Sequence, residues 1–285
     1  MADERRDDSD PAGRLASLRT SDGYDLAYRV WDPPPTGAAR GTMVLFNGVM
    51  SHALWFRPLA RALGQAGFKL VGADRRGTGT NTAARGDAPD AETLVADARA
   101  IVARERLPGL PLHLVGWCWG AVLAVNLAAE LGPDLTTLML LTPGLFPTDE
   151  LKRRMAEQEP VARASPPDRP CLESPIDERM FTTGPALAGF ILADADRLVL
   201  FTPRFHAAMA KLGLGARLKL AKVRVPILVV LASDDRATDN RETERGIGKL
   251  TGGRAVVERV AGAHGLQFDA PAALADAMIG FALRP

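Results

Sequence analysis

A cysteine stands at the centre of the pentapeptide at residues 116–120, which reads Gly-Trp-Cys-Trp-Gly. The pentapeptide lies between an apolar run at residues 112–115 and an alanine-rich stretch at residues 121–131. A nucleophile held on a sharp strand-to-helix turn needs glycines on both sides, because other side chains clash there. The helix N-terminus that follows favours a thiolate and stabilises a developing oxyanion. Cys118 is therefore predicted to be an exposed, activated nucleophile, and the alternative is a small buried cysteine in a structural turn.

A cysteine nucleophile needs a general base, and the base needs an acid that orients it. The adjacent residues Asp234 and Asp235 follow one apolar run, and His264 follows the last such run in the sequence Ala-Gly-Ala-His-Gly. Because the carboxyl ends of parallel strands meet at one edge of a sheet, loops distant in sequence can assemble one site. The predicted catalytic residues are Cys118, Asp235 and His264, with Asp234 as the alternative acid.

The other three histidines have weaker claims on the role of base. His113 lies inside the apolar run before the cysteine and is expected to pack in the core. His206 lies in a region expected to cover the site, where it caps a helix or faces solvent. His52 is expected to shape a loop beside the site and to contact the substrate.

Short apolar runs alternate with helical stretches from residue 42 onward, which predicts a mostly parallel sheet covered by helices on both faces. The expected strands are residues 43–46, 69–73, 112–115, 137–141, 227–231 and 255–260, preceded by a hairpin of residues 14–20 and 26–31. The expected helices are residues 56–66, 91–105, 121–131, 240–250 and 271–283.

The alternation stops between residues 144 and 221. This stretch holds helical segments near residues 150–159, 186–194 and 204–212 and a proline-rich loop at 165–170. An insertion at the edge where the catalytic loops meet predicts a helical lid, and the alternative is two ordinary crossover helices with long loops. The predicted division is a flexible tail (1–13), a core (14–143 and 222–285) and a lid (144–221).

Two further segments carry a family resemblance. Residues 46–52 read Phe-Asn-Gly-Val-Met-Ser-His, and residues 74–79 read Asp-Arg-Arg-Gly-Thr-Gly. With the glycine-flanked nucleophile and the order nucleophile, acid, histidine, they make the chain similar to the α/β-hydrolase superfamily over nearly its whole length. The branch that it resembles contains monoacylglycerol lipases and lysophospholipases. The resemblance implies an α/β-hydrolase fold, with the helical lid inserted after the sixth strand.

In that branch the first segment supplies an oxyanion-hole donor, so the resemblance implies backbone N–H donors at Val49 and Trp119. The chain departs from the branch twice, with Asn47 where histidine is usual and Cys118 where serine is usual. Residues 74–77 are expected to fix a turn beside the site through charge-assisted hydrogen bonds.

Sulfur in place of oxygen changes the chemistry, because a thiolate attacks carbonyl groups readily and leaves a thioester on the enzyme. Relatives with cysteine at this turn include dienelactone hydrolases and polyhydroxyalkanoate synthases, so the resemblance implies lactone hydrolysis or acyl transfer. We expect a hydrolase that acts on an ester, thioester or lactone through an acyl-cysteine. The alternatives are an acyltransferase with a non-water acceptor, a noncatalytic ligand-binding protein, and a cysteine introduced for a native serine to trap a complex.

The expected substrate is a small molecule with an apolar acyl group. The residues predicted to contact it are His52 and three lid aromatics, Phe181, Phe190 and Phe201. Trp119 is expected either to wall the acyl pocket or to pack against the following helix.

Composition excludes several classes of function. The formal net charge of +1 provides no basic stripe for nucleic acid. The four histidines are widely separated and the two cysteines form no CxxC pair, so no metal is predicted, and the expected chemistry needs no cofactor. Residues 1–8 are acidic and contain no apolar segment, which predicts neither a secretory signal nor a membrane span and favours the cytoplasm. The oligomeric state is left open.

Overall fold

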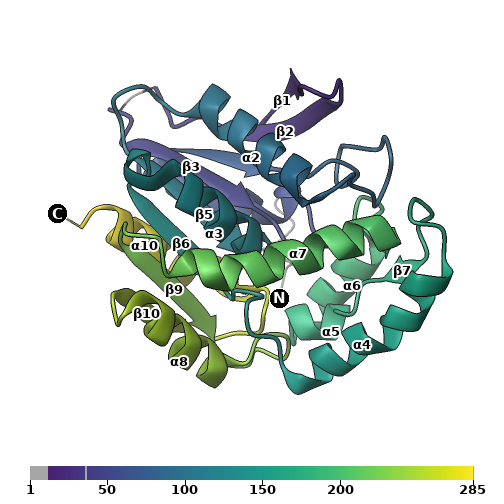
Figure 1. The fold of residues 1–285 in the computed structure, drawn as a ribbon. Coiled ribbons are helices and arrows are strands. Elements are labelled where there is room, and N and C mark those ends of the chain that lie inside the picture. The colour runs from purple at the N-terminus through teal and green to yellow at the C-terminus, as the bar shows by residue number, and fades with distance from the viewer. Residues whose placement is uncertain (1–11, 36, 285) are drawn as a thin grey trace.

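A computed structural model describes residues 12–35 and 37–284 of the chain. The central sheet begins with an antiparallel hairpin of β1 (Arg14–Arg19) and β2 (Asp25–Trp31). Its parallel strands are β3 (Gly41–Phe46), β4 (Phe68–Ala73), β5 (Leu112–Trp117), β6 (Thr137–Leu141), β9 (Ile227–Ala232) and β10 (Ala255–Val260). The strand order is β1-β2-β4-β3-β5-β6-β9-β10 (Figure 1). The prediction of a mostly parallel sheet is confirmed.

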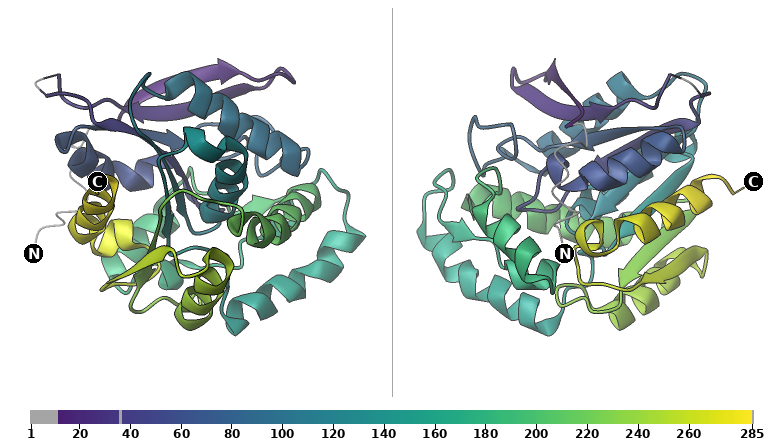
Figure 2. Two further views of the ribbon diagram at one scale, coloured as in Figure 1. Left: turned by 60° about the vertical axis from the view of Figure 1, so that its left-hand side comes forward. Right: turned by 180° about the vertical axis from the view of Figure 1, so that it is seen from behind.

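Helices cover both faces of this sheet (Figure 2). One face packs against α1 (Arg57–Gln65) and α10 (Pro271–Ala282). The other face packs against α2 (Ala91–Glu105), α3 (Gly120–Leu131) and α8 (Asn240–Thr251). Short helical turns complete the core at η1 (Ala53–Phe56), η2 (Gly132–Asp134) and α9 (Leu266–Asp269). Helix α2 begins and ends at the predicted residues.

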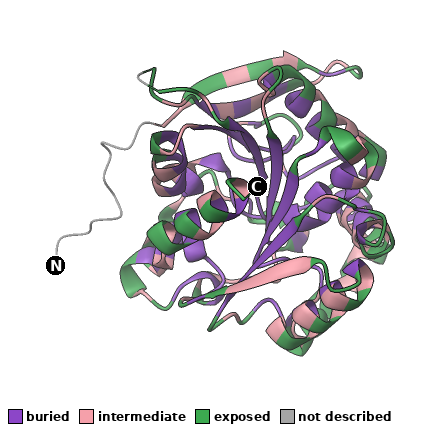
Figure 3. Ribbon diagram, turned by 90° about the vertical axis from the view of Figure 1, so that its left-hand side faces the viewer, coloured by how far each residue is buried: buried purple, intermediate pink, exposed green. Residues whose placement is uncertain are grey.

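The parallel strands are hydrophobic throughout because neither face of the sheet meets water. Every residue of β3, β4, β5 and β9 is buried, and Figure 3 shows these strands enclosed by helices with exposed outer faces. β6 and β10 have their predicted bounds, whereas the other parallel strands are one or two residues longer. The longer β5 carries the sheet directly to the pentapeptide.

The segment between β6 and β9 corresponds to the predicted lid and contains helices and two short strands. Its elements are α4 (Asp149–Ala164), β7 (Leu172–Glu173), α5 (Glu178–Phe181), α6 (Pro185–Ala193), β8 (Leu200–Phe201) and α7 (Pro203–Leu220). Helix α7 packs along α3, and its buried side chains belong to the same core cluster. It is therefore a crossover helix of the core, as the alternative interpretation had it. The boundary between lid and core at residue 221 stays a prediction.

The lid elements are attached to loops that follow β3 and β4. The Leu198 backbone N–H donates to the Met50 carbonyl oxygen at 2.9 Å. The Thr202 hydroxyl donates to the Asp87 carboxylate at 2.7 Å. These bonds hold the segment around β8 over the carboxyl edge of the sheet, where the predicted catalytic loops lie.

Of the predicted tail at residues 1–13, only the last two residues lie within the described part of the chain. Among the helices of that part, none combines the length and apolar character that a bilayer-spanning segment requires.

Candidate active site

Cys118 lies on the turn between β5 and α3 with a positive φ of 56°, a strained value for a residue with a side chain. Its backbone N–H donates to the Leu141 carbonyl oxygen at 3.1 Å, which fixes the turn to β6. A Cβ atom on Gly116 would overlap Ala121, and one on Gly120 would overlap the backbone of β3. The flanking glycines are therefore required by space, as the sequence predicted for a nucleophile elbow.

The Cys118 side chain is reached through a cavity and not from the open surface. Only 4% of the residue is exposed, so the prediction of an exposed nucleophile is wrong. Cys118 and His264 both line a cavity of about 410 Å³. A substrate must therefore enter this cavity to meet the sulfur.

His264 and Asp235 form a buried pair at the same edge of the sheet. The His264 Nδ1 atom lies 2.9 Å and 3.0 Å from the two carboxylate oxygens of Asp235, and both side chains are fully buried. Asp235 also accepts hydrogen bonds from the backbone N–H groups of Ala237 and Thr238, each at 2.8 Å. The structure brings Asp235 to the histidine, whereas the exposed Asp234 accepts a bond from its neighbour Ser233.

The charge on His264 is favoured by its neighbours. Burial disfavours the imidazolium, but the charges of Asp235 and Cys118 outweigh burial and raise the pKa of His264 to about 10. Within the described residues, the buried Nε2 atom has no partner at ordinary hydrogen-bond geometry. Catalytic hydrogen bonds are often loose before substrate binds. The Nε2 proton of this imidazolium is thus available to the sulfur of Cys118.

Trp117, which precedes Cys118, helps to fix the backbone of His264. Its indole N–H donates to the His264 carbonyl oxygen at 3.2 Å, and the Thr142 hydroxyl donates to the same oxygen at 3.1 Å. Sequence reasoning did not find this role, because neither residue type signals it.

Val49 and Trp119, the predicted oxyanion donors, both line the cavity beside Cys118. Neither backbone N–H donates a hydrogen bond within the part of the chain that the structure describes. A Cβ atom on Gly48 would lie 3.2 Å from the Cys118 Cβ atom, so the loop before Val49 runs against the cysteine. Both N–H groups remain available to a ligand.

Asn47, at the position where the resembled branch has histidine, holds this loop in place. Its side-chain amide donates to the Asp74 carboxylate at 2.9 Å, and the Ala53 backbone N–H donates to the same carboxylate oxygen at 2.7 Å. Complete burial raises the pKa of Asp74 despite these bonds and the nearby charges of His52 and Arg75. The departure from histidine therefore preserves an anchored loop.

His52 does not line the cavity at Cys118, so its expected contact with substrate is corrected. Its Nε2 atom lies 2.8 Å from the Asp194 carboxylate, which also accepts a bond from the Trp55 indole at 2.5 Å. Among the described residues, His52, Asp194 and Asp196 have oxygen and nitrogen atoms close enough for a shared cation. Because His52 and Trp55 already use Asp194, we assign this group to shaping the loop.

The lid aromatics divide into one cavity residue and two buried supports. Phe201 lines the cavity, whereas Phe181 and Phe190 do not, and their predicted role in substrate binding is corrected. Phe181 packs against Trp117 and His264, with ring centroids at 5.6 Å and 5.8 Å, and Phe190 packs against Phe268. The Phe181 ring therefore shields one side of His264 from water.

Sequence reasoning missed most of the cavity wall. Apolar side chains from α4 and α7 supply much of it, namely Leu151, Met155, Met209 and Leu214. Leu151 and Met155 lie four residues apart in the mainly polar first half of α4, a spacing that places them on one face. This spacing is the feature of the sequence from which an apolar face of α4 toward the cavity could have been predicted.

The two remaining histidines differ in position. His113 is fully buried and packs in the core, as predicted, with its Nδ1 atom 2.8 Å from the Thr137 hydroxyl. His206 lines the cavity, and its Nε2 atom lies 3.8 Å from the Glu159 carboxylate.

The elbow, the acid and the histidine, in this chain order at the carboxyl edge of a parallel sheet, define an α/β-hydrolase. Residues 37–270 match the model of the Hydrolase_4 family, described as serine aminopeptidase, S33, and the chain belongs to this family. It is therefore an enzyme of the α/β-hydrolase superfamily, with cysteine at the central position of the elbow.

Individual relatives agree with this assignment. The chain is 28% identical to human monoglyceride lipase over 141 residues, which span 49% of this chain and 46% of that enzyme. A soluble variant of monoglyceride lipase from Saccharomyces cerevisiae superposes with a TM-score of 0.81 at 17% identity and covers 96% of both chains. The thioesterase domain from the curacin biosynthetic pathway superposes with a TM-score of 0.65 at 18% identity, covering 95% of this chain and 100% of the domain. At these identities the solved structures show a shared fold.

Proposed function

We propose that this chain is an acyl-processing hydrolase in which Cys118 forms an acyl-cysteine with an ester, thioester or lactone. The observation that carries the proposal is that Cys118, at positive φ on the elbow, and His264, which is paired with the buried Asp235, line the same cavity. A noncatalytic binding protein would have no need of an acid and a base in these positions.

Before the reaction, His264 holds at Nε2 the proton that the Cys118 thiol has given up, while the Asp235 carboxylate accepts from Nδ1, so the sulfur is a thiolate. The sulfur forms a bond to the substrate carbonyl carbon, and the carbonyl electron pair moves onto oxygen. Backbone N–H groups of Val49 and Trp119 stabilise that oxyanion. When the carbonyl re-forms, the bond to the leaving group breaks, and the leaving group takes the proton from His264.

In the second half, His264 removes a proton from water, and the hydroxide oxygen attacks the thioester carbon. Collapse of this second tetrahedral species breaks the carbon–sulfur bond and releases a carboxylic acid. The sulfur leaves as a thiolate and His264 keeps the proton taken from water, so the enzyme returns to its starting state. An amine, thiol or alcohol in place of water would make the same steps an acyl transfer.

The cysteine favours activated acyl donors. A thiolate leaves a tetrahedral intermediate more readily than an alkoxide does, so an unactivated alkyl ester would return to starting material. Thioesters, lactones and aryl esters carry leaving groups that compete with sulfur. The apolar walls of the cavity support a mainly apolar acyl group. The thioesterase among the structural neighbours supports activated donors such as thioesters. The similarity to monoglyceride lipase supports an apolar acyl group.

Intact-mass spectrometry tests the proposal. The protein is incubated with matched thioester, aryl-ester and alkyl-ester donors, and the mass of one acyl group is expected on Cys118 from the activated donors. Clearance by water marks a hydrolase, whereas clearance only after an amine or thiol is added marks an acyltransferase. Substrate binding without any adduct or turnover would support the noncatalytic alternative. A faster reaction with a long-chain glycerol ester would return the protein to lipase chemistry.

A further inference from the structure

Arg75, the second residue after β4, holds the loop that carries the first oxyanion donor. Its Nη1 atom donates to the Gly48 carbonyl oxygen at 2.6 Å, and its Nη2 atom donates to the Val49 carbonyl oxygen at 2.6 Å. A longer bond of 3.3 Å joins Nη1 to the Asn47 side-chain oxygen. One planar guanidinium thus fixes three consecutive residues, which fork geometry permits and a lysine ammonium does not.

The same guanidinium also contacts the residue that carries the second donor. Its central carbon lies 5.3 Å from the centroid of the Trp119 ring and 5.4 Å from that of Phe205 on α7. A cation over an aromatic face at this distance is attracted to it. Arg75 therefore links the loop after β3, the elbow after β5 and the helix that covers them.

The charge of Arg75 is buried without a carboxylate at ion-pair distance among the described residues. The residue is only 5% exposed, and its Nε atom is buried without a hydrogen-bond partner in the same part of the chain. Burial lowers the pKa of Arg75 to about 10, while the charges of Asp74 and Cys118 act in the opposite direction. The guanidinium is therefore charged at neutral pH.

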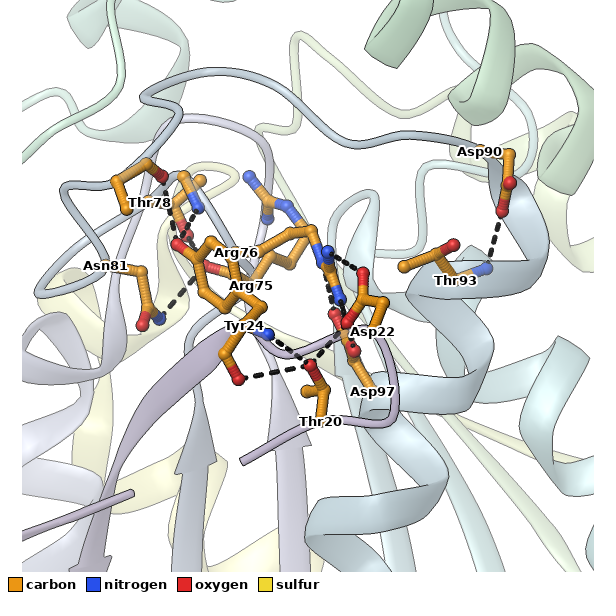
Figure 4. Close-up of polar contacts among 12 residues, drawn as sticks. Thr20, Asp22, Tyr24, Arg75, Arg76, Thr78, Asn81, Asp90, Thr93 and Asp97 are labelled. Atoms are coloured by element: carbon orange, nitrogen blue, oxygen red, sulfur yellow. Dashed lines mark hydrogen bonds and ion pairs between the residues drawn. The ribbon is translucent and has the colours of Figure 1, made fainter. Parts of the chain in front are cut away.

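The neighbouring arginine shows what an ordinary structural role looks like in this loop. Arg76 is equally buried, but it forms ion pairs with Asp22 and Asp97, each with a contact of 2.7 Å (Figure 4). These pairs tie the β1–β2 turn to α2 at a distance from the elbow. A buried charge without a carboxylate partner is costly. Because no carboxylate in the described part of the chain compensates Arg75 as Asp22 and Asp97 compensate Arg76, its positive charge can act on the groups at the elbow.

We infer that Arg75 is a positioning residue for the proposed reaction, which fixes both oxyanion-hole segments and directs a permanent positive charge at the Cys118 site. This inference rests on the proposed function. A thiolate on Cys118 and an oxyanion beside it are both negative, and a fixed buried cation stabilises them more strongly than an exposed one. A purely structural role would require only the bonds to the loop.

Three variants separate these contributions. Arg75→Met removes both charge and bonds, and the acylation rate constant is expected to fall roughly 10²-fold with little change in KM, as for loss of an oxyanion-hole donor. Arg75→Lys keeps the charge without the fork and is expected to recover only part of that rate. Arg76→Met is the matched control, since it breaks buried ion pairs in the same loop and is expected to lower Tm without the selective loss of acylation.

Alkylation of Cys118 by iodoacetamide gives a readout that does not depend on turnover. The charged groups that interact electrostatically with Cys118 are His264 from the loop after β10 and Arg75 from the loop after β4, and these two interact in turn with Asp235 and Asp74. In Arg75→Met the pH of half-maximal alkylation is expected to rise, and in Arg75→Lys it is expected to stay close to that of the unaltered protein.

The outcomes separate this inference from the proposed function. If the unaltered protein is never acylated on Cys118, the proposed function fails regardless of Arg75. If it is acylated, and folded Arg75→Met matches its acylation rate and alkylation profile, the inference is overturned. Should Arg75→Met not fold, Arg75→Lys decides: an acylation rate equal to that of the unaltered protein would reject the positioning role, and a selective loss would support it.

Discussion

Two fully buried histidines lie at opposite edges of the same sheet and have opposite electrostatics. At the carboxyl edge, Asp235 and Cys118 outweigh burial and raise the pKa of His264 to about 10. At the amino edge, the ring nitrogens of His113 have the Thr137 hydroxyl as their only hydrogen-bond partner among the described residues, and burial lowers the pKa of His113 to about 4. Burial alone therefore makes a neutral core histidine, and a buried carboxylate turns the same residue type into a proton carrier.

The largest loss of activity is expected from a change at Cys118, which raises the pKa of His264 and does not affect His113. Cys118→Ala removes the atom that forms the covalent bond, so turnover should fall at least roughly 10⁴-fold. Steady-state kinetics with an aryl ester and intact-mass spectrometry measure the loss. Cys171→Ala is the control and should retain both acylation and turnover. Full activity of Cys118→Ala would remove sulfur from the mechanism.

Asp235→Asn should make His264 resemble His113, because it replaces the carboxylate with a neutral partner. The pKa of His264 should fall, and turnover should fall by roughly 10⁴-fold, as in serine enzymes that lose this acid. NMR titration of the His264 ring and measurement of kcat test the two effects. Asp234→Asn is the control on the adjacent exposed residue and should change kcat little. Equal losses at both aspartates would contradict the assignment of the acid.

His113 should make the protein sensitive to acid. Its pKa lies near 4 when folded against an ordinary value of 6.5, so between these pH values the unfolded chain binds a proton that the folded chain does not. The contribution of His113 to stability is therefore constant above pH 6.5, falls as the pH drops toward 4, and changes by about 3 kcal/mol in total.

Urea unfolding at pH 7 and pH 4 measures this loss. The double variant His113→Leu with Thr137→Val removes both the titrating ring and its hydroxyl partner. The unaltered protein should lose about 3 kcal/mol more than this variant over the interval. An identical loss in both proteins would show that His113 does not control the acid response.

The sequence indicated where the elbow and the parallel strands lie because strict local requirements leave a trace in residue types. Gly116 and Gly120 have no room for a Cβ atom, and buried parallel strands must be apolar throughout. The choice of Asp235 over Asp234 also follows a fixed spacing from the end of β9.

The roles of side chains in the predicted lid could not be read from the sequence because their contacts are not local. The sequence marks Phe181 and Phe190 as apolar, but only the fold decides that they support His264 and Phe268 from behind while Phe201 lines the cavity. The two-residue strands β7 and β8 are too short for any hydrophobic period to identify them. The positions of Arg75 and Trp117 likewise depend on neighbours far away in the chain.

The smallest expected effect concerns the cavity at the carboxyl edge of the sheet. Met155→Ala removes apolar wall from α4, so the preference between long and short acyl chains should shift by roughly tenfold, the scale of one or two methylene groups in a hydrophobic pocket. Val161→Ala is the matched control, because Val161 is similarly exposed on the same helix and does not line the cavity. The ratio of kcat/KM for a series of aryl esters measures the preference. An equal shift in Val161→Ala would mean that α4 acts through the position of the whole helix, and the wall assigned to Met155 would then be wrong.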